Sequence, residues 1–206
     1  MNKRIVFWLI AALTLALAPL NASAILISST QLTAAELGAV TTQNNPLFDS
    51  SSGVVFQNVA GSEVNVRRSP FDTADPDPWN NRAHGLYTSV SGGAAGTYTF
   101  DQVQSELSMI WGSPDTYNSL ELLLGDSLTP FVIIIPGTTI GAPPAPQLGA
   151  WQFTVSDTKF DRVVFKSGQN AFEFANFTTV AVPEPGTLAL LGMGLLALAG
   201  LRRKLL

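Results

Sequence analysis

Short apolar runs separated by turn-forming residues cover most of the chain, and they predict β-strands rather than helices. Most runs are rich in Val, Ile, Phe or Trp, the residues that fit a pleated and half-buried surface. The predicted strands are 53–59, 63–67, 86–90, 97–100, 107–111, 119–124, 131–135, 151–155, 160–166 and 171–180. The turn Ala60-Gly61-Ser62 predicts that the first two form a hairpin.

Two of these runs have patterns that assign their faces. Val64 and Val66 alternate with three polar residues, which predicts a half-buried antiparallel strand over 63–67. Phe131 to Ile135 is a continuous apolar run, which predicts a strand buried on both faces. Between these strands, residues 68–85 contain three prolines among Asp and Asn residues and predict a long surface loop.

Helical periodicity is confined to Ser28 to Val40, where a short amphipathic helix is expected. Ser29 or Thr30 is the expected N-cap. The apolar residues Leu32, Leu37 and Val40 would then lie on one side.

Many short strands with almost no helix predict an all-β fold, namely a single antiparallel β-sandwich of two sheets, jelly-roll-like, over residues 25–181. The strand order does not follow from the pattern. The residues expected to point inward are Val64, Val66, Phe131, Ile133, Phe153, Val163, Phe165, Phe172 and Phe174.

The first apolar run begins directly after two basic residues. Lys3 and Arg4 precede an uncharged run over 5–20, and Ala22-Ser23-Ala24 supplies the small residues of a signal-peptidase site. We therefore expect residues 1–24 to be a signal peptide that signal peptidase removes after Ala24. The alternative is an uncleaved membrane helix, and either interpretation implies export.

The last apolar run follows a segment that is rich in proline. Pro183 and Pro185 fix φ and withhold two backbone donors, so Val182 to Pro185 should be extended. Residues 186–201 carry no charge and predict a transmembrane helix. At about 24 Å it is short for a bilayer core of about 30 Å. The basic residues Arg202, Arg203 and Lys204 should remain in the cytoplasm.

This C-terminal order of Val182-Pro183-Glu184-Pro185, apolar segment and basic cluster over 182–206 resembles the PEP-CTERM sorting signal of exosortase-dependent surface proteins in Gram-negative bacteria. Gly186-Thr187-Leu188 also matches the usual continuation of that signal. The resemblance implies an inner-membrane precursor, processing by an exosortase, and transfer to the cell surface or the exopolysaccharide matrix. The alternative is an ordinary tail anchor with a proline-rich preface.

Two internal segments are similar to recurrent segments of one subgroup of these surface proteins. They are Trp111-Gly112-Ser113-Pro114-Asp115-Thr116-Tyr117-Asn118 and Ala171-Phe172-Glu173-Phe174-Ala175-Asn176-Phe177. In that subgroup the last strand leads directly into the sorting signal. Ala175 stands where an Asp is common, so no role is carried over to that position.

Charge and composition exclude several classes of function. Five of the 11 Lys and Arg lie within 1–24 or 202–204, which leaves 6 against all 15 acidic residues over 25–185 and a net charge of −9. Nucleic acid is therefore not an expected partner, because phosphate binding needs clustered cations. The chain has no cysteine, so disulfides and thiolate chemistry are excluded.

Candidate chemistry is sparse, and no cofactor is expected. His84 is the single histidine, and the simplest interpretation is a solvated loop residue. Asp72, Asp75 and Asp77 offer oxygen ligands suited to Ca²⁺, although their spacing does not match an EF-hand and a solvated acidic loop is the alternative. The loop aromatics Trp79 and Tyr117 are the candidates for contact with a ligand such as a sugar.

Two classes of function remain. The first is a non-enzymatic surface or matrix protein that makes adhesive contacts or binds carbohydrate, and the absence of a recognisable catalytic motif favours it. The second is a secreted sandwich-fold hydrolase that acts on polysaccharide. A cleft holding two carboxylates would favour the hydrolase.

Overall fold

The structure is a computed structural model, and it describes residues 24–40, 44–72, 85–125, 131–140, 149–183 and 193–194. Within these ranges lie ten strands, one short α-helix and two 3-10 turns. In chain order they are β1 (Leu26–Gln31), α2 (Ala34–Gly38), β2 (Ser50–Ser52), β3 (Val55–Val59), η1 (Pro70–Asp72), β4 (Tyr87–Val90), β5 (Ala95–Gly112), β6 (Asn118–Leu124), β7 (Phe131–Pro136), η2 (Gly137–Thr139), β8 (Ala150–Ser156), β9 (Phe160–Ser167) and β10 (Phe172–Ala181).

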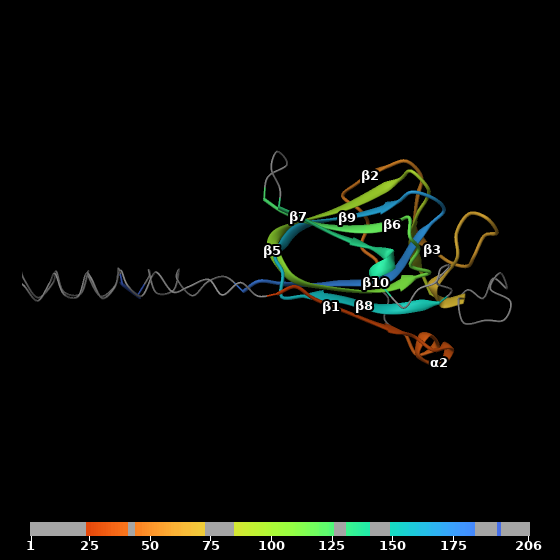
Figure 1. Cartoon of the computed structure of the whole chain (residues 1–206), viewed down its shortest axis with the longest axis horizontal. Helices are drawn as coiled ribbons and strands as arrows, with labels where there is room; N and C mark the ends of the chain where they lie inside the picture. The colour runs from red at the N-terminus through yellow and green to blue at the C-terminus, as the bar shows by residue number, and fades with distance from the viewer. Residues whose placement is uncertain are drawn as a thin grey trace, which may run out of the picture.

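All pairings among the named strands are antiparallel, and they form two layers that share β5. The first layer has the order β3-β4-β10-β5-β8-β1, and the second has the order β2-β5-β9-β6-β7. The expected all-β fold is confirmed. In Figure 1, β5 curves at one end of the molecule and passes from one layer to the other.

The curve in β5 lies where its pairing with β9 is interrupted. Thr99 pairs with Arg162, but the next partners are Gln104 and Phe160. The intervening Asp101 is exposed, as expected where a strand leaves one ladder and joins another. The sequence analysis predicted two strands here, 97–100 and 107–111, whereas the structure has one strand that serves both layers.

The main core lies between the two layers and is rich in aromatic rings. Phe153, Val163, Phe165, Phe172 and Phe174 are fully buried, which confirms the faces predicted for them. The ring of Phe165 stacks on that of Phe174 with 4.1 Å between centroids. Such pairs add to the free energy that the burial of apolar area supplies.

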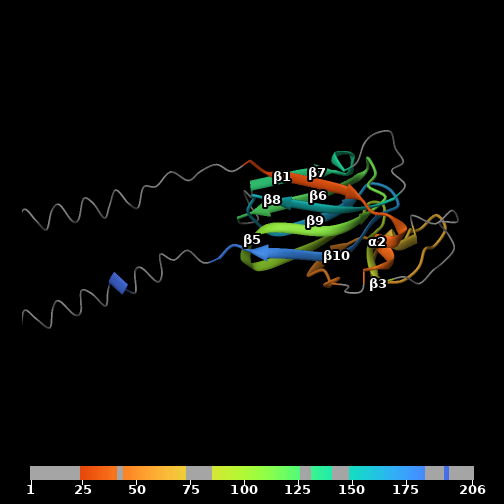
Figure 2. The same cartoon turned by 90° about the horizontal axis from the view of Figure 1, so that it is seen from below.

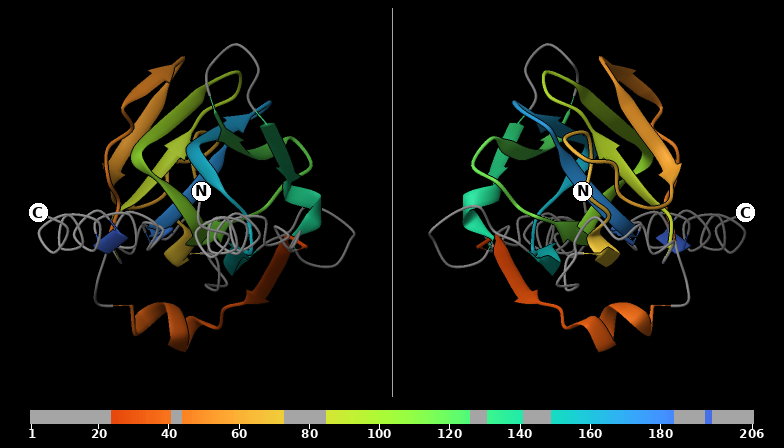
Figure 3. Two further views of the ribbon diagram at one scale, coloured as in Figure 1. Left: turned by 90° about the vertical axis from the view of Figure 1, so that its left-hand side faces the viewer. Right: turned by 90° about the vertical axis from the view of Figure 1, so that its right-hand side faces the viewer.

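A second apolar cluster covers the outer face of the first layer. It contains Leu37 of α2, Phe71 of η1, and Ile110 and Ala175 of the sheet. Figure 3 shows α2 on the side of this layer that faces away from the second layer. Strand β10 is therefore buried on both faces, and the small side chain of Ala175 fits beneath this cover.

The predicted helix over 28–40 is wrong in its first half. Residues 28–31 belong to β1, which pairs with β8, and the helix begins only at Ala34. Thr33 is the N-cap instead of Ser29 or Thr30, and it forms a capping box with Glu36. The apolar side of the helix is still recognisable, because Leu37 is buried while Leu32 and Val40 pack against the same cluster.

The predicted hairpin of 53–59 with 63–67 is also wrong. Residues 63–67 form a turn closed on itself by a bridge between Glu63 and Arg67, and β3 pairs with β4 instead. Val64 is 58% exposed and Val66 is only half-buried. An alternating pattern over five residues does not separate a strand from a polar turn, and here Asn65 has a φ of 62°, which no regular strand allows.

Strand β7 was expected to be buried on both faces, and it is not. It pairs with β6 and lies at the end of its layer, so only one face meets the core. Ile135 is buried and Ile133 packs against the main core, whereas Val132 and Ile134 are 41% and 60% exposed. The side chain of Phe131 lies outside what the structure describes.

The first and last strands share one end of the molecule, which we call the terminal end. Figure 2 shows β1 beginning and β10 ending there. In the first layer, Gln104 of β5 lies opposite Ala181, and Gly112 lies opposite Glu173. This stretch of strand, at about 3.3 Å per residue, places the opposite end, which we call the far end, roughly 26 Å away.

Candidate functional site

A pocket with a volume of about 320 Å³ opens at the far end of the molecule. Three chain segments line it: 65–68 before η1, Ser113, Asp115 and Tyr117 after β5, and Asn170, Ala171 and Glu173 at the start of β10. The volume is at the lower limit of pockets that hold small molecules. The pocket thus depends on residues that are about 50 positions apart in the sequence and meet only in the fold.

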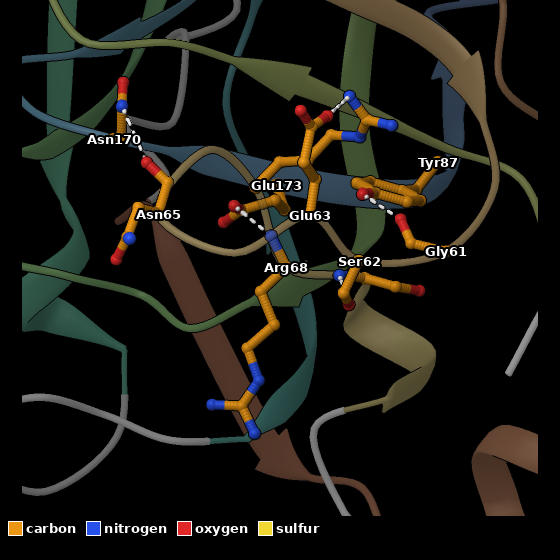
Figure 4. Close-up of polar contacts among 10 residues, drawn as sticks. Gly61, Ser62, Glu63, Asn65, Arg68, Tyr87, Asn170 and Glu173 are labelled. Atoms are coloured by element: carbon orange, nitrogen blue, oxygen red, sulfur yellow. Dashed lines mark hydrogen bonds and ion pairs between the residues drawn. The ribbon is translucent and has the colours of Figure 1, made fainter. Parts of the chain in front are cut away.

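Glu173 fixes the first of these segments to the sheet. It lies on β10 and, because side chains alternate along a strand, faces away from the core that Phe172 and Phe174 enter. Its Oε1 accepts a hydrogen bond of 2.9 Å from the backbone N–H of Arg68. Figure 4 shows this carboxylate directed at the Arg68 nitrogen, while the side chain of Arg68 extends away from it.

Neighbouring bonds hold segment 60–69 in place. The hydroxyl of Tyr87 donates to the Gly61 carbonyl at 2.6 Å, and Ser69 N–H donates to the Ser62 hydroxyl at 2.9 Å. The side-chain amide of Asn170 donates to the Asn65 carbonyl at 3.3 Å, which connects this segment to the start of β10 (Figure 4). The wall of the pocket is therefore formed before any ligand arrives.

Tyr117, predicted from the sequence as a ligand contact, lines the pocket. Its hydroxyl lies 2.6 Å from Oδ2 of Asp115 and 3.1 Å from the Asn170 carbonyl, and it can donate to either. The segment turns sharply at Ser113, whose φ is 46°. Trp79, the other predicted contact, lies outside the described residues.

Two buried carboxyl groups share the pocket. Burial raises the pKa of Glu173 well above its usual range, and the negative charge of Asp115 adds to this, while the N–H of Arg68 opposes it. Burial likewise raises the pKa of Asp115, against the hydrogen bond from Tyr117. Both groups therefore favour the protonated form more than an exposed carboxyl does.

Two other polar atoms at the pocket are buried without a partner. Within the described part of the chain, neither the hydroxyl of Ser113 nor Nε of Arg67 makes a hydrogen bond. The Nη1 atom of Arg67 is engaged, since it contacts Glu63 at 2.8 Å, and its guanidinium lies 4.7 Å from the centre of the Phe56 ring. A buried polar atom without a partner is costly, so a hydroxyl-bearing guest that reached these atoms would be stabilised.

Of the three predicted calcium ligands, the structure describes Asp72 alone. Asp72 is buried in η1, where its Oδ2 accepts a 2.8 Å hydrogen bond from the Ser62 hydroxyl. Asp75, Asp77 and His84 lie outside the described residues. In the part of the chain that the structure covers, no three acidic, His or Cys side chains gather as metal ligands.

Sequence reasoning missed most of the pocket, although one signal pointed to it. The two internal segments singled out by resemblance, 111–118 and 171–177, pair along β5 and β10 and both contribute to the pocket. Asp115 and Glu173 come from these segments. Arg67 and Arg68 had no such signal, because Arg67 was assigned to a strand and Arg68 to the long loop after it.

At the terminal end, the fold stops where the proline-rich segment begins. Ala181 is the last residue of β10, Val182 N–H donates to the Val103 carbonyl at 2.8 Å, and Pro183 is exposed. Ala24 is exposed directly before β1. The other predicted signal residues, namely Ala22, Glu184, Pro185, Arg202, Arg203 and Lys204, lie outside the described residues. Among the residues that are described, no helix is long and apolar enough to cross a membrane.

Comparison with known proteins finds a match at this terminal end. The family model of the PEP-CTERM protein-sorting motif matches residues 181–204. No curated protein matches the chain. The matched residues begin at the last residue of β10, so the motif follows the folded domain without a linker. The chain therefore carries a PEP-CTERM protein-sorting motif, which indicates export, processing at the membrane by an exosortase, and a place at the cell surface.

Proposed function

We propose that this protein is a non-enzymatic component of the cell surface or exopolysaccharide matrix, displayed by exosortase-dependent sorting. A signal peptide over 1–24 directs export, and signal peptidase removes it. Residues 25–181 fold as one domain outside the inner membrane. The transmembrane helix within 182–206 and the basic residues after it hold the precursor until an exosortase acts. The sorting motif matched at residues 181–204 carries this proposal.

The junction between domain and motif supports it. Strand β10 ends at Ala181, and only the backbone N–H of Val182 continues the pairing. Pro183 is exposed, and neither it nor Pro185 can donate to a ladder. We therefore expect the segment that contains Glu184 to stay out of the sheet and within reach of a membrane enzyme.

Substitutions in the Pro-Glu-Pro segment test the sorting proposal. Glu184→Ala and Pro185→Ala leave the apolar segment intact, so an ordinary tail anchor would tolerate both. We expect each to trap an uncleaved precursor in the inner membrane, as seen by cell fractionation and by intact-mass analysis of the protein from cells with and without the exosortase.

The matched control is Asp101→Ala, an exposed acidic residue in the curve of β5. It removes one negative charge near the terminal end and should leave processing unchanged. Release and trimming of the Glu184→Ala protein like the parent would reject exosortase sorting and leave the tail anchor as the explanation.

The strand order supports a jelly-roll assignment for the domain. A jelly roll is a long antiparallel ribbon folded so that the first strand pairs with the eighth, the second with the seventh, and so on. Here β4 pairs with β10, the two halves of β5 pair with β9 and β8, and β6 pairs with β7. The second and third strands of the ribbon are then the two halves of β5, with β1, β2 and β3 added at the edges.

The hydrolase is the second candidate, because Asp115 and Glu173 line the same pocket. Glycoside hydrolysis needs two carboxyl groups that both reach the substrate. Here Oε1 of Glu173 accepts the Arg68 N–H, and Oδ2 of Asp115 lies within hydrogen-bond distance of the Tyr117 hydroxyl. These engagements favour a positioning role over catalysis, and the experiment described below separates the two.

A further inference from the structure

The pocket at the far end lies opposite the point where the chain is tethered. Both β1 and β10 meet the sorting and export segments at the terminal end (Figure 2). The pocket opens beside Glu173 and Ser113, at the other end of β5 and β10. In the displayed protein, the pocket is therefore the part that faces outward from the attachment.

The chemistry of the lining points to a neutral ligand with several hydroxyl groups. Two acidic residues, Asp115 and Glu173, line the pocket together with two basic residues, Arg67 and Arg68. The formal charges of these four side chains balance, so the lining favours neither a cation nor an anion. The groups that line the pocket include both donors and acceptors of hydrogen bonds.

A sugar hydroxyl satisfies both kinds of group, since it donates one hydrogen bond and accepts two. The side chains of Arg67 and Ser113 line the pocket, and each has one buried polar atom without a partner within the described residues. A side-chain rotation that turns Nε of Arg67 or the Ser113 hydroxyl toward the pocket would give it a sugar hydroxyl as partner. The half-buried ring of Tyr117 offers an apolar face to the C–H groups of a pyranose. A volume of about 320 Å³ suits one sugar unit rather than a long chain.

We propose that this pocket binds a single neutral sugar unit, presented at the end of a glycan, through Ser113, Arg67, Asp115 and Tyr117. The proposal deepens the function proposed above, since it assigns the exopolysaccharide contact to one site. Glu173 is a positioning residue, because it holds segment 65–68 against the sheet through the Arg68 N–H. The bonds among the three segments pre-form the site, which lowers the cost of ordering on binding.

Titration of the full-length chain with neutral disaccharides tests the site. The protein is purified in a zwitterionic detergent, because a detergent with a sugar headgroup would compete with the probes for the pocket. Maltose, cellobiose, mannobiose and chitobiose are the probes, measured by saturation-transfer NMR and calorimetry. Glucuronate, inorganic phosphate and Ca²⁺ serve as charged comparisons. We expect at least one neutral disaccharide to bind and the charged probes to bind more weakly.

Variants assign the binding to the pocket. Ser113→Ala, Asp115→Asn and Tyr117→Phe should each weaken binding roughly tenfold, the loss expected for one hydrogen bond. The matched control is Tyr98→Phe, which removes a hydroxyl that donates to the Pro46 carbonyl in the other layer. It should leave affinity unchanged. Thermal melting of every variant separates loss of the site from loss of the fold.

Three results would overturn the proposal: no binding of any neutral probe at millimolar concentration, binding that the pocket variants leave unchanged, or preference for a charged probe. Cleavage of a bound disaccharide, lost in Asp115→Asn and Glu173→Gln, would replace it with the hydrolase. None of these measurements depends on exosortase, so a failure here leaves the sorting proposal standing, and a failure of sorting leaves the pocket intact.

Discussion

Glu173 belongs both to strand β10 and to the lining of the pocket. Its neighbours Phe172 and Phe174 enter the main core, so strand alternation directs Glu173 to the opposite face of β10. There it is covered by segment 60–72 and is only 3% exposed. A carboxyl group in this position is stabilised by the Arg68 N–H but penalised by burial, and the second effect is the larger.

The raised pKa of Glu173 predicts how stability depends on pH. The unfolded chain loses this proton near pH 4.5, whereas the native state holds it to a higher pH. The free energy of unfolding should therefore fall as pH rises from about 4.5 through the native pKa. Glu173→Gln keeps the acceptor for Arg68 but has no proton to lose, so its melting temperature should rise relative to the parent across this window.

The control for this comparison is Glu106→Gln, a half-buried residue of β5 that lies opposite Val180 at the terminal end. Thermal melts of the full chain at pH 4 to 8 measure all three proteins. If the parent and Glu173→Gln changed in parallel with pH, the buried carboxyl would not be the titrating group.

At the scale of elements, strands β10 and β7 show that the cover on each face of a strand decides its burial. Strand β10 packs against the main core with one face and against the cluster of α2 and η1 with the other, whereas Val132 and Ile134 on the outer face of β7 are exposed. Both are rich in apolar residues. The difference between them lies in their neighbours and not in their composition.

Truncation in these two strands should have unequal effects. Phe172 is fully buried and stacks on Trp111 with ring centroids 4.3 Å apart, so Phe172→Ala should cost about 3 to 5 kcal/mol of unfolding free energy. Ile134 of β7 is 60% exposed, so Ile134→Ala should change stability by less than about 1 kcal/mol. Chemical denaturation measures both, and equal losses would show that the face of β7 is assigned wrongly.

The whole molecule has two functional ends joined by a rigid sheet. The terminal end leads into the matched sorting motif, and the far end carries the pocket, roughly 26 Å away along β5. Because β1 begins and β10 ends at the terminal end, away from the pocket, attachment to the membrane there should not obstruct the pocket.

A trapped precursor tests this arrangement. The Glu184→Ala precursor should stay uncleaved in the inner membrane of spheroplasts. There it should bind the disaccharide that binds the purified chain, with the same affinity as the purified chain. The measurement is retention of that sugar in labelled form, with the precursor carrying Glu184→Ala and Tyr117→Phe together as the control. Retention equal to that control, despite binding by the purified chain, would mean that the far end faces the membrane.

The sequence alone determined what depends on local order along the chain. The sorting motif is linear, so its residues could be identified without a fold, and the family model matches them. The signal peptide over 1–24 stays a prediction. Strand alternation correctly placed Phe153, Val163 and Phe165 in the core. The turn chemistry around Tyr117 also placed it in a loop, and that was enough to nominate it as a ligand contact.

Only the tertiary structure decided what depends on pairing between distant segments. Strand order, the passage of β5 through both layers and the exposed face of β7 follow from neighbours that an isolated run of residues does not specify. The pocket is the clearest case. Arg67, Asp115 and Glu173 are ordinary polar residues in the sequence, and they line one pocket only because the fold brings their three segments together at the far end.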